Sequence, residues 1–275
     1  MTDRTAFWVE VPRDFLMISG PDAQTYLHSQ VSQEIRELAV GQARWSLVLQ
    51  PTGKVDSLVR ILRSGDTAFV LDTDGGWGDR LLARLQRFKI RVTADLETIP
   101  WRCLAVRGAD VTPAAGSIAV PAWWGAGVDL LGPSPAPPPG VPEGSAGEYE
   151  RARIVAGWPA LGAEITESSI PAETGLVDVA VSFTKGCYPG QELVERMNSR
   201  GSTAPRLLRR VVLPHEVGDT AGTPIRLDGA EVGRVTSSAG DAALALVSRQ
   251  VAVPQDVVLA LPGGDQPARI HALTA

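Results

Sequence analysis

A change of pattern at Arg206 constrains the fold of this chain most. Strand and helix patterns alternate through residues 1–100, whereas the segments after Arg206 have strand patterns only. Strand–helix alternation followed by strands alone indicates an α+β module joined to a separate all-β module. Residues 206–275 therefore predict a small β-barrel or sandwich, with Asp228-Gly229 as one of its hairpin turns.

The N-terminal module is expected to be a sheet with helices on one face. Amphipathic spacing predicts helices over residues 21–38 and 79–89. The Pro51-Thr52-Gly53 turn is expected to join two of the strands. The expected strands cover residues 14–19, 43–50, 54–63, 67–73 and 89–97.

The middle of the chain contains a proline-rich stretch, "PSPAPPPGVPEGSAG", which is typical of a linker or surface loop. After it we expect a short helix at 151–158, a strand-like run "LVDVAVSF", and a helix from Gln191 to Asn198 that Gly201 stops. The expected division is an N-terminal α+β module, 1–132; a linker or loop, 133–148; a second part of the core, 149–205; and a β-barrel, 206–275.

Composition excludes several classes of protein. The net charge of −5 predicts no bulk attraction to nucleic acid or to an anionic membrane. The N-terminus lacks the pattern of a signal peptide, and no apolar run approaches the roughly 18 residues of a spanning helix. Two cysteines make no disulfide framework, so the cytoplasm is the expected compartment.

The sequence lacks the motifs of several common catalytic and binding sites. The three histidines and two cysteines are scattered, so a Cys/His zinc site is not expected. The sequence has no phosphate loop, no dinucleotide-binding glycine motif and no nucleophile elbow. His28, on the first predicted helix, is interpreted as a partly buried or surface histidine, and the Trp123-Trp124 pair as packing residues.

The segment "FTKGCYPGQE" carries the strongest chemical signal. Cys187 lies just before a predicted helix and two residues after Lys185. Both features are expected to lower the pKa of a thiol and to favour the nucleophilic, metal-binding thiolate. Gly186 and Gly190 would allow a close approach of the backbone. A buried cysteine in a glycine-rich turn is the alternative that the residues alone leave open.

The motif Lys-Gly-Cys-Tyr-x-Gly-Gln-Glu resembles the signature of the YgfZ family, relatives of the glycine-cleavage T-protein, an aminomethyltransferase. The similarity extends beyond the motif. It includes "ISGPDAQTYLHSQVSQEIREL", "GQARWSLVLQPTGKV", "AGWPALGAEITESSIPAE" and "VGRVTSSAGDAALALVSR".

The resemblance implies a three-part architecture around an opening that admits tetrahydrofolate or a derivative. It also implies a role in assembling or maintaining iron–sulfur proteins, including those that modify tRNA. Cys187 would be the functional thiol and could ligate a cluster shared with a partner, because one cysteine does not hold a cluster alone. The implied partners are iron–sulfur carrier or client proteins. The motif residues are Lys185, Gly186, Tyr188, Gly190, Gln191 and Glu192, with Arg196 on the same surface.

The chain departs from the T-protein at two positions. Where the T-protein has paired carboxylates, this chain has Asp56 followed by Ser57. Where the T-protein has the glutamate that holds the pterin ring, this chain has Val155.

The favoured hypothesis is therefore a maintenance factor for iron–sulfur proteins that is not a conventional enzyme. The alternative is a tetrahydrofolate-dependent one-carbon transferase or demethylase, in which Asp56 would contribute to the folate site. A plain cysteine nucleophile is a third, weaker option.

Overall fold

The structure is a computed structural model that describes residues 6–122, 124–199 and 204–273. The chain divides into two compact units, each made of two stretches of sequence. Unit 1 comprises Met1–Ser145 and Asp178–Leu193, and unit 2 comprises Ala146–Val177 and Val194–Ala275. The short helices α4 (Val177–Ala180) and α5 (Gln191–Ser199) lie where the chain passes between the units.

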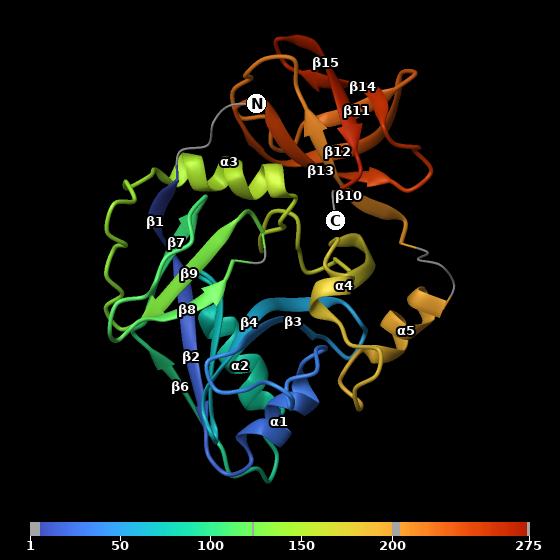
Figure 1. The fold of residues 1–275 in the computed structure, drawn as a ribbon. Helices are drawn as coiled ribbons and strands as arrows, with labels where there is room; N and C mark the ends of the chain where they lie inside the picture. Colours follow the sequence, from blue (N-terminus) through green and yellow to red (C-terminus); the bar gives the residue numbers. More distant parts are fainter. Residues whose placement is uncertain (1–5, 123, 200–203, 274–275) are drawn as a thin grey trace. The chain divides into compact units, whose positions relative to one another are not determined.

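Unit 1 contains two antiparallel sheets (Figure 1), of order β3-β4-β5-β2-β6 and β1-β7-β9-β8. Its elements are β1 (Phe7–Val11), β2 (Arg13–Ser19), α1 (Ala23–Gln30), β3 (Ala43–Leu49), β4 (Val55–Gly65), β5 (Ala68–Asp74), α2 (Gly78–Arg87), β6 (Asp95–Ile99), β7 (Arg102–Arg107), β8 (Ile118–Pro121) and β9 (Gly127–Gly132). The strands predicted at 14–19, 43–50, 54–63 and 67–73 are confirmed, as is the helix at 79–89.

Two apolar layers hold unit 1 together. Leu27 of α1 and Leu81 of α2 pack on Ile61 and other side chains of one face of the five-stranded sheet. The opposite face buries residues such as Leu62 against Leu131 of the four-stranded sheet. The prediction of helices on one face is therefore confirmed, and a second sheet covers the other face. The strand predicted at 89–97 begins only at Asp95.

Unit 2 contains a closed six-stranded barrel, drawn from orange to red in Figure 1, in the order β10-β13-β12-β11-β14-β15. Its other elements are α3 (Ala146–Ala156) and the 3₁₀ turn η1 (Pro171–Glu173). The strands are β10 (Arg206–Val212), β11 (Pro224–Leu227), β12 (Ala230–Ala239), β13 (Ala242–Ser248), β14 (Gln255–Leu261) and β15 (Gly264–His271). Asp228 and Gly229 both have positive φ, at 50° and 82°. These are the angles of a type I′ hairpin, so the predicted barrel and its turn are confirmed.

Two sequence predictions are wrong. The helix expected over residues 21–38 ends at Gln30, because Val31 pairs with Val48 of β3 in an isolated bridge. Ile35 and Leu38 are buried as the pattern required, but not as part of a helix. The strand expected from "LVDVAVSF" is the one-turn helix α4 followed by an irregular segment. The expected stop at Gly201 lies outside the described residues.

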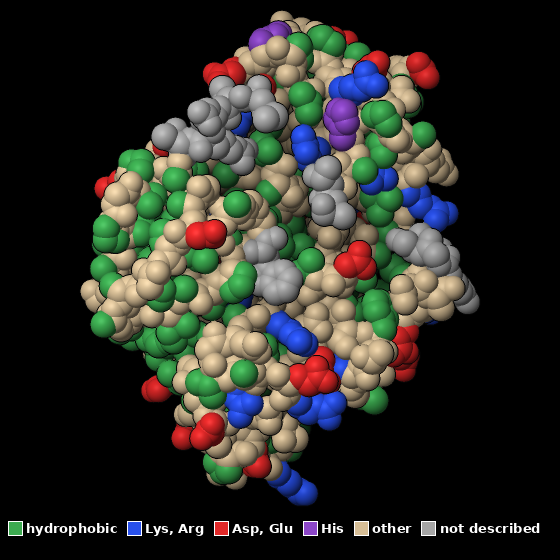
Figure 2. Space-filling model, viewed as in Figure 1, with side chains coloured by type: hydrophobic (Ala, Val, Ile, Leu, Met, Phe, Trp, Pro, Cys, Tyr) green, Lys and Arg blue, Asp and Glu red, His purple; other side chains and the backbone are tan. Residues whose placement is uncertain are grey.

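No helix within the described ranges is long and apolar enough to cross a membrane. On the face shown in Figure 2, the Lys and Arg side chains of the described residues are interspersed with Asp and Glu and form no continuous basic stripe.

Candidate functional site

The Cys187 loop, residues 181–190, connects α4 with α5. Cys187 is exposed, whereas the other cysteine, Cys103, is buried in unit 1. Burial raises the pKa of the Cys103 thiol to about 12. The exposed position excludes the buried cysteine that the sequence had left as an alternative. Activation of the thiol by its neighbours stays a prediction.

The start of the loop is fixed to the segment that follows α1. The Ser32 hydroxyl donates to the carbonyl oxygen of Ala180 at 2.7 Å. The Gln33 side-chain amide donates to the carbonyl oxygen of Val179 at 2.9 Å. The backbone N–H of Ser182 donates to the carbonyl oxygen of Ser32 at 2.9 Å. These bonds occupy backbone groups that a strand would have paired with a neighbouring strand, and they explain why α4 and its extension are not a strand.

The side chain of Lys185 binds the C-terminal end of helix α1. Its ammonium group donates to the carbonyl oxygen of His28 at 2.6 Å and to that of Val31. The same nitrogen lies 5.0 Å from the centroid of the Tyr188 ring. Burial lowers the pKa of Lys185 to about 8. No local sequence pattern indicates this contact, because Lys185 and His28 are 157 positions apart.

The end of the loop is a tight turn. The N–H of Gln191 approaches the carbonyl oxygen of Tyr188 at 3.4 Å, with Pro189 and Gly190 between them. Gly190 has φ +82°, and Pro followed by a positive-φ Gly is typical of a type II turn. The Gln191 side-chain oxygen accepts from the Tyr188 N–H at 3.0 Å, which closes the turn at the start of α5.

This turn packs against the β3–β4 hairpin. A Cβ on Gly190 would lie 2.5 Å from the carbonyl oxygen of Gln50 and 2.9 Å from Cα of Gly53. A Cβ on Gly53 would in turn meet the side chain of Leu193 at 2.5 Å. The close approach predicted for Gly190 is confirmed, and the Pro51-Thr52-Gly53 turn is the surface that it approaches. Glu192 and Arg196 are exposed on α5, and their part in the site stays a prediction.

His28 lies under the loop, which the sequence interpretation missed. Its ring carbon Cε1 is 3.8 Å from the position that a Cβ on Gly186 would take. Its Nε2 is 3.2 Å from the Glu34 carboxylate, which Arg36 also binds at 2.9 Å. Burial, and next the charge of Lys185, lower the pKa of His28. His28, interpreted from the sequence as a partly buried or surface histidine, is in fact buried, and its position beside the motif was not foreseen.

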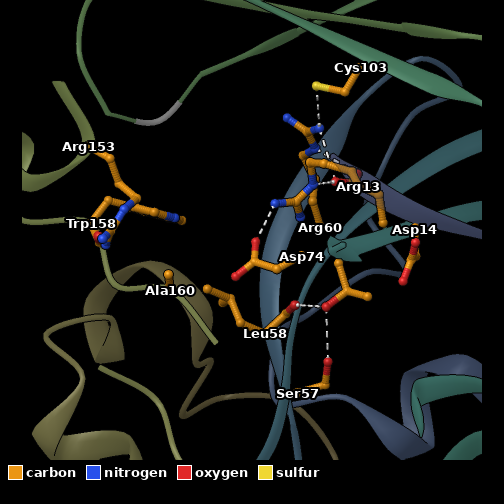
Figure 3. A network of polar contacts seen from close by, with 12 residues as sticks. Arg13, Asp14, Ser57, Leu58, Arg60, Asp74, Cys103, Arg153, Trp158 and Ala160 are labelled. Carbon is orange, nitrogen blue, oxygen red and sulfur yellow. Dashed lines mark hydrogen bonds and ion pairs between the residues drawn. The ribbon is translucent and has the colours of Figure 1, made fainter. Parts of the chain in front are cut away.

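Asp56 is the second residue of β4 and lies close to the turn of the same hairpin. Its Oδ1 accepts from the Arg80 guanidinium at 2.8 Å, and its Oδ2 lies 3.8 Å from Nε of Arg84. Arg84 also donates to the carbonyl oxygen of Leu49 at 2.9 Å. Asp56 is thus paired with α2 and buried. Ser57, the next residue, shares a 3.2 Å hydrogen bond with the Thr73 hydroxyl, which also donates to the carbonyl oxygen of Leu58 (Figure 3).

A buried ionic network lies between the two sheets of unit 1 (Figure 3). Arg60 is fully buried, and its guanidinium binds Asp72 at 2.9 Å and Asp129 at 2.5 Å. Arg107 donates to Asp129 at 2.7 Å, and Arg13 donates to Asp74 at 2.7 Å. Each buried charge has an opposite partner, as burial in a low dielectric requires. The network is part of the framework that supports the hairpin.

The fold is that of the glycine-cleavage aminomethyltransferases. The crystal structure of aminomethyltransferase T from Bartonella henselae superposes with a TM-score of 0.78 over 99% of this chain and 86% of that one, at 17% identity. No family model matches the sequence.

Two relatives place the chain within this fold class. The "Iron-sulfur cluster assembly factor IBA57 homolog, mitochondrial" of Pyricularia oryzae is 30% identical over 246 residues, covering 82% of this chain and 61% of that protein. The "tRNA-modifying protein YgfZ" of Edwardsiella ictaluri is 30% identical over 215 residues, covering 67% and 64%. The chain thus spans less than two thirds of the length of both relatives. It belongs to the YgfZ-like family, as the motif at residues 185–192 predicted.

Proposed function

We propose that this protein acts in the assembly or maintenance of iron–sulfur proteins, including those that modify tRNA, and that Cys187 is its functional thiol. The observation that carries the proposal is an exposed cysteine on a loop fixed at both ends, in a chain related to IBA57 and YgfZ. The cluster is cargo held by a partner, because one thiolate supplies a single ligand of the four that a cluster needs. The partners are cluster carriers or client proteins.

A shared cluster would require one accessible thiol from this chain. Within the part of the chain that the structure describes, no three His, Cys, Asp or Glu side chains gather where they could hold a metal ion. The two cysteines differ in exposure, and the buried thiol of Cys103 lies 3.9 Å from a guanidinium nitrogen of Arg60. Cys187 is therefore the thiol that could meet a cluster on another protein.

Tetrahydrofolate or a derivative is the proposed small-molecule ligand, on the strength of the aminomethyltransferase fold. Val155, half-buried on α3, stands where the resemblance implies the pterin-binding glutamate. Leaving a polar edge of the pterin unpaired costs about 1–3 kcal/mol per group. Folate would be held through other contacts, and we propose that it tunes the conformation of the protein.

The one-carbon transferase is the second candidate, and Asp56 favours it. A carboxylate at this position would have to accept a proton from, or orient, a reacting amine. Here the Asp56 carboxylate is neutralised by Arg80 and lies close to Arg84, and the neighbouring Ser57 supplies no second carboxylate. Formation of 5,10-methylenetetrahydrofolate by the purified protein, lost in Asp56→Asn, would establish transfer chemistry. We expect none to be detected.

The maintenance function is tested in cells that lack the protein and are complemented with wild type, Cys187→Ser or Cys103→Ala. The readout is the activity of several iron–sulfur enzymes, normalised to the amount of each enzyme. We expect wild type and Cys103→Ala to restore these activities and Cys187→Ser to fail, at equal levels of folded protein. Full restoration by Cys187→Ser would overturn the role of the thiol, and unchanged activities in the deficient cells would overturn the function itself.

A further inference from the structure

The helix α1 ends without the glycine that commonly closes a helix. Its C-cap residue, Val31, is extended, with φ −116° and ψ 154°. The last carbonyl groups of a helix have no partner within the helix and carry partial negative charge. At the end of α1 two carbonyl oxygens, those of His28 and Val31, accept hydrogen bonds from the ammonium group of Lys185.

We infer that Lys185 is a positioning residue, which fastens the Cys187 loop to the C-terminal end of α1 and so sets where the thiol is presented. This inference rests on the proposed function for the purpose of the thiol, whereas the position of the thiol can be measured without it. Lys185 occupies the motif position two residues before Cys187, so the hydrogen bonds act directly on the thiol-bearing loop.

The surroundings of the ammonium group suit a lysine. Two carbonyl oxygens lie on one side, and the ring of the buried Tyr188 lies 5.0 Å away. A compact point charge with three donors fits such a site, and it is stabilised both by the carbonyls and by the face of the ring. The same ammonium group also holds the Tyr188 ring in position, because it contacts both the ring and the end of α1.

The loop has a second fixed point on the far side of Cys187. The Gly190 turn lies against Gln50 and Gly53 of the β3–β4 hairpin, at distances that leave no room for a Cβ. Only the arc Gly186–Pro189 lies between the two fixed points. The ring of His28 lies close to this arc, with its Cε1 3.8 Å from the position that a Cβ on Gly186 would take. A thiol held in this way needs little ordering when a partner binds, which favours affinity.

The test uses a nitroxide spin label on the full-length protein. Cys187 is the exposed cysteine and Cys103 is buried, so the label reports on the loop. We expect a broad, immobilised spectrum for wild type. In Lys185→Met, which keeps the length of the stem but loses the charge, the rotational correlation time should fall by at least about threefold, because a freed loop moves on the nanosecond timescale.

The matched control is Lys54→Met. Lys54 is an exposed lysine of the same hairpin that receives the Gly190 turn. Its replacement removes the same charge from the same neighbourhood and should leave the spectrum as in wild type. Circular dichroism and the thermal midpoint show whether each variant is folded. If Lys185→Met does not fold, Lys185→Gln, which has a shorter neutral side chain, takes its place.

The outcomes separate the two proposals. An equally immobile label in the folded Lys185 variant overturns the positioning role, whatever the thiol does. A mobile label, together with restoration of iron–sulfur enzyme activity by Cys187→Ser, keeps the positioning role and overturns the proposed function. A mobile label in Lys54→Met as well would show that the spectrum follows surface charge and not the contact with α1, and it would overturn the inference.

Discussion

Gly190 is held in a backbone conformation that favours glycine, and it also lies against another stretch of main chain. Its φ is +82°, and a Cβ would meet the carbonyl oxygen of Gln50 at 2.5 Å. Two separate penalties therefore apply to any larger residue at this position. Gly41 shares only the first penalty, because its φ is +88° and nothing lies within 4 Å of its Cβ position.

We predict that Gly190→Ala destabilises the protein more than Gly41→Ala does. Left-handed backbone costs an alanine roughly 1 kcal/mol, which is the expected effect at Gly41. Crowding against the hairpin adds about 1–3 kcal/mol at Gly190. Urea denaturation of both variants measures the difference. Equal losses of stability would show that the loop does not pack on the hairpin as described.

Glu34 makes the site sensitive to acid. Hydrogen bonds from Arg36 are the largest cause that holds the pKa of Glu34 at about 2, against roughly 4.3 in an unfolded chain. As the pH falls from about 4.3 to about 2, Glu34 takes up a proton first in the unfolded state. The free energy of unfolding therefore decreases over this range. The contribution of Glu34 is complete above about pH 4.3 and is lost as the pH approaches 2.

We predict that replacing Glu34 changes how steeply the free energy of unfolding declines as the pH falls. Glu34→Gln should flatten the decline between about pH 4.3 and 2, as measured by urea midpoints across that range. Glu37→Gln removes a carboxylate from an exposed neighbouring position and should leave the slope unchanged. A wild-type slope in Glu34→Gln would contradict the coupling of Glu34 to Arg36 and His28.

At the scale of elements, Arg60 joins strands of both sheets in unit 1. It lies on β4 and binds Asp72 of β5 and Asp129 of β9. Removing one partner from a buried ionic group leaves the other charges without compensation, which costs about 3–5 kcal/mol. Arg60→Met should therefore lower the free energy of unfolding by about this amount.

Arg102→Met is the matched control for Arg60→Met. Arg102 pairs with Glu10 across the same four-stranded sheet, but both side chains are about half exposed. Exposed pairs contribute little, so the urea midpoint should not change measurably. A small effect of Arg60→Met, similar to that of Arg102→Met, would mean that the network is not a structural element of the sheet interface.

The elements that periodicity predicted well are those whose partners are close in sequence. The β3–β4 hairpin and the Asp228-Gly229 turn follow from local turn chemistry. The errors fall where distant segments compete for the backbone. Residues after Gln30 leave the helix to pair with β3, and Val179 and Ala180 give their carbonyl groups to side chains of Gln33 and Ser32.

The candidate site shows the same limit. The motif predicted close packing at Gly186 and Gly190, and this is confirmed at Gly190 but not at Gly186, where the nearest atom lies 3.8 Å from the Cβ position. The functional role of Cys187 stays a prediction. The sequence did not reveal that Lys185 binds the end of α1, that His28 lies under Gly186, or that Asp56 is paired with Arg80. Each of these contacts joins residues that only the fold brings together. The four-part division of the chain stays a prediction.

At the scale of the whole molecule, two features matter most: the fold and the exposed Cys187 thiol. The aminomethyltransferase fold supplies the framework, and the Cys187 loop, which belongs to unit 1, presents a cysteine at the surface. At the two positions where the resemblance to the T-protein implies carboxylates, this chain has Ser57 and Val155. We propose the exposed Cys187 thiol as the functional group of the protein, and a cluster on another protein as its counterpart.

The most direct measurement is the rate at which Cys187 is alkylated under anaerobic conditions in the presence of an iron–sulfur carrier protein. We predict that the cluster-loaded carrier slows alkylation at least about tenfold, because the thiolate that reacts is then bound to the cluster. The cluster-free carrier should not slow it. Mass spectrometry of the Cys187 peptide gives the rate. Equal rates with loaded and cluster-free carrier would contradict the claim that this thiol meets a cluster.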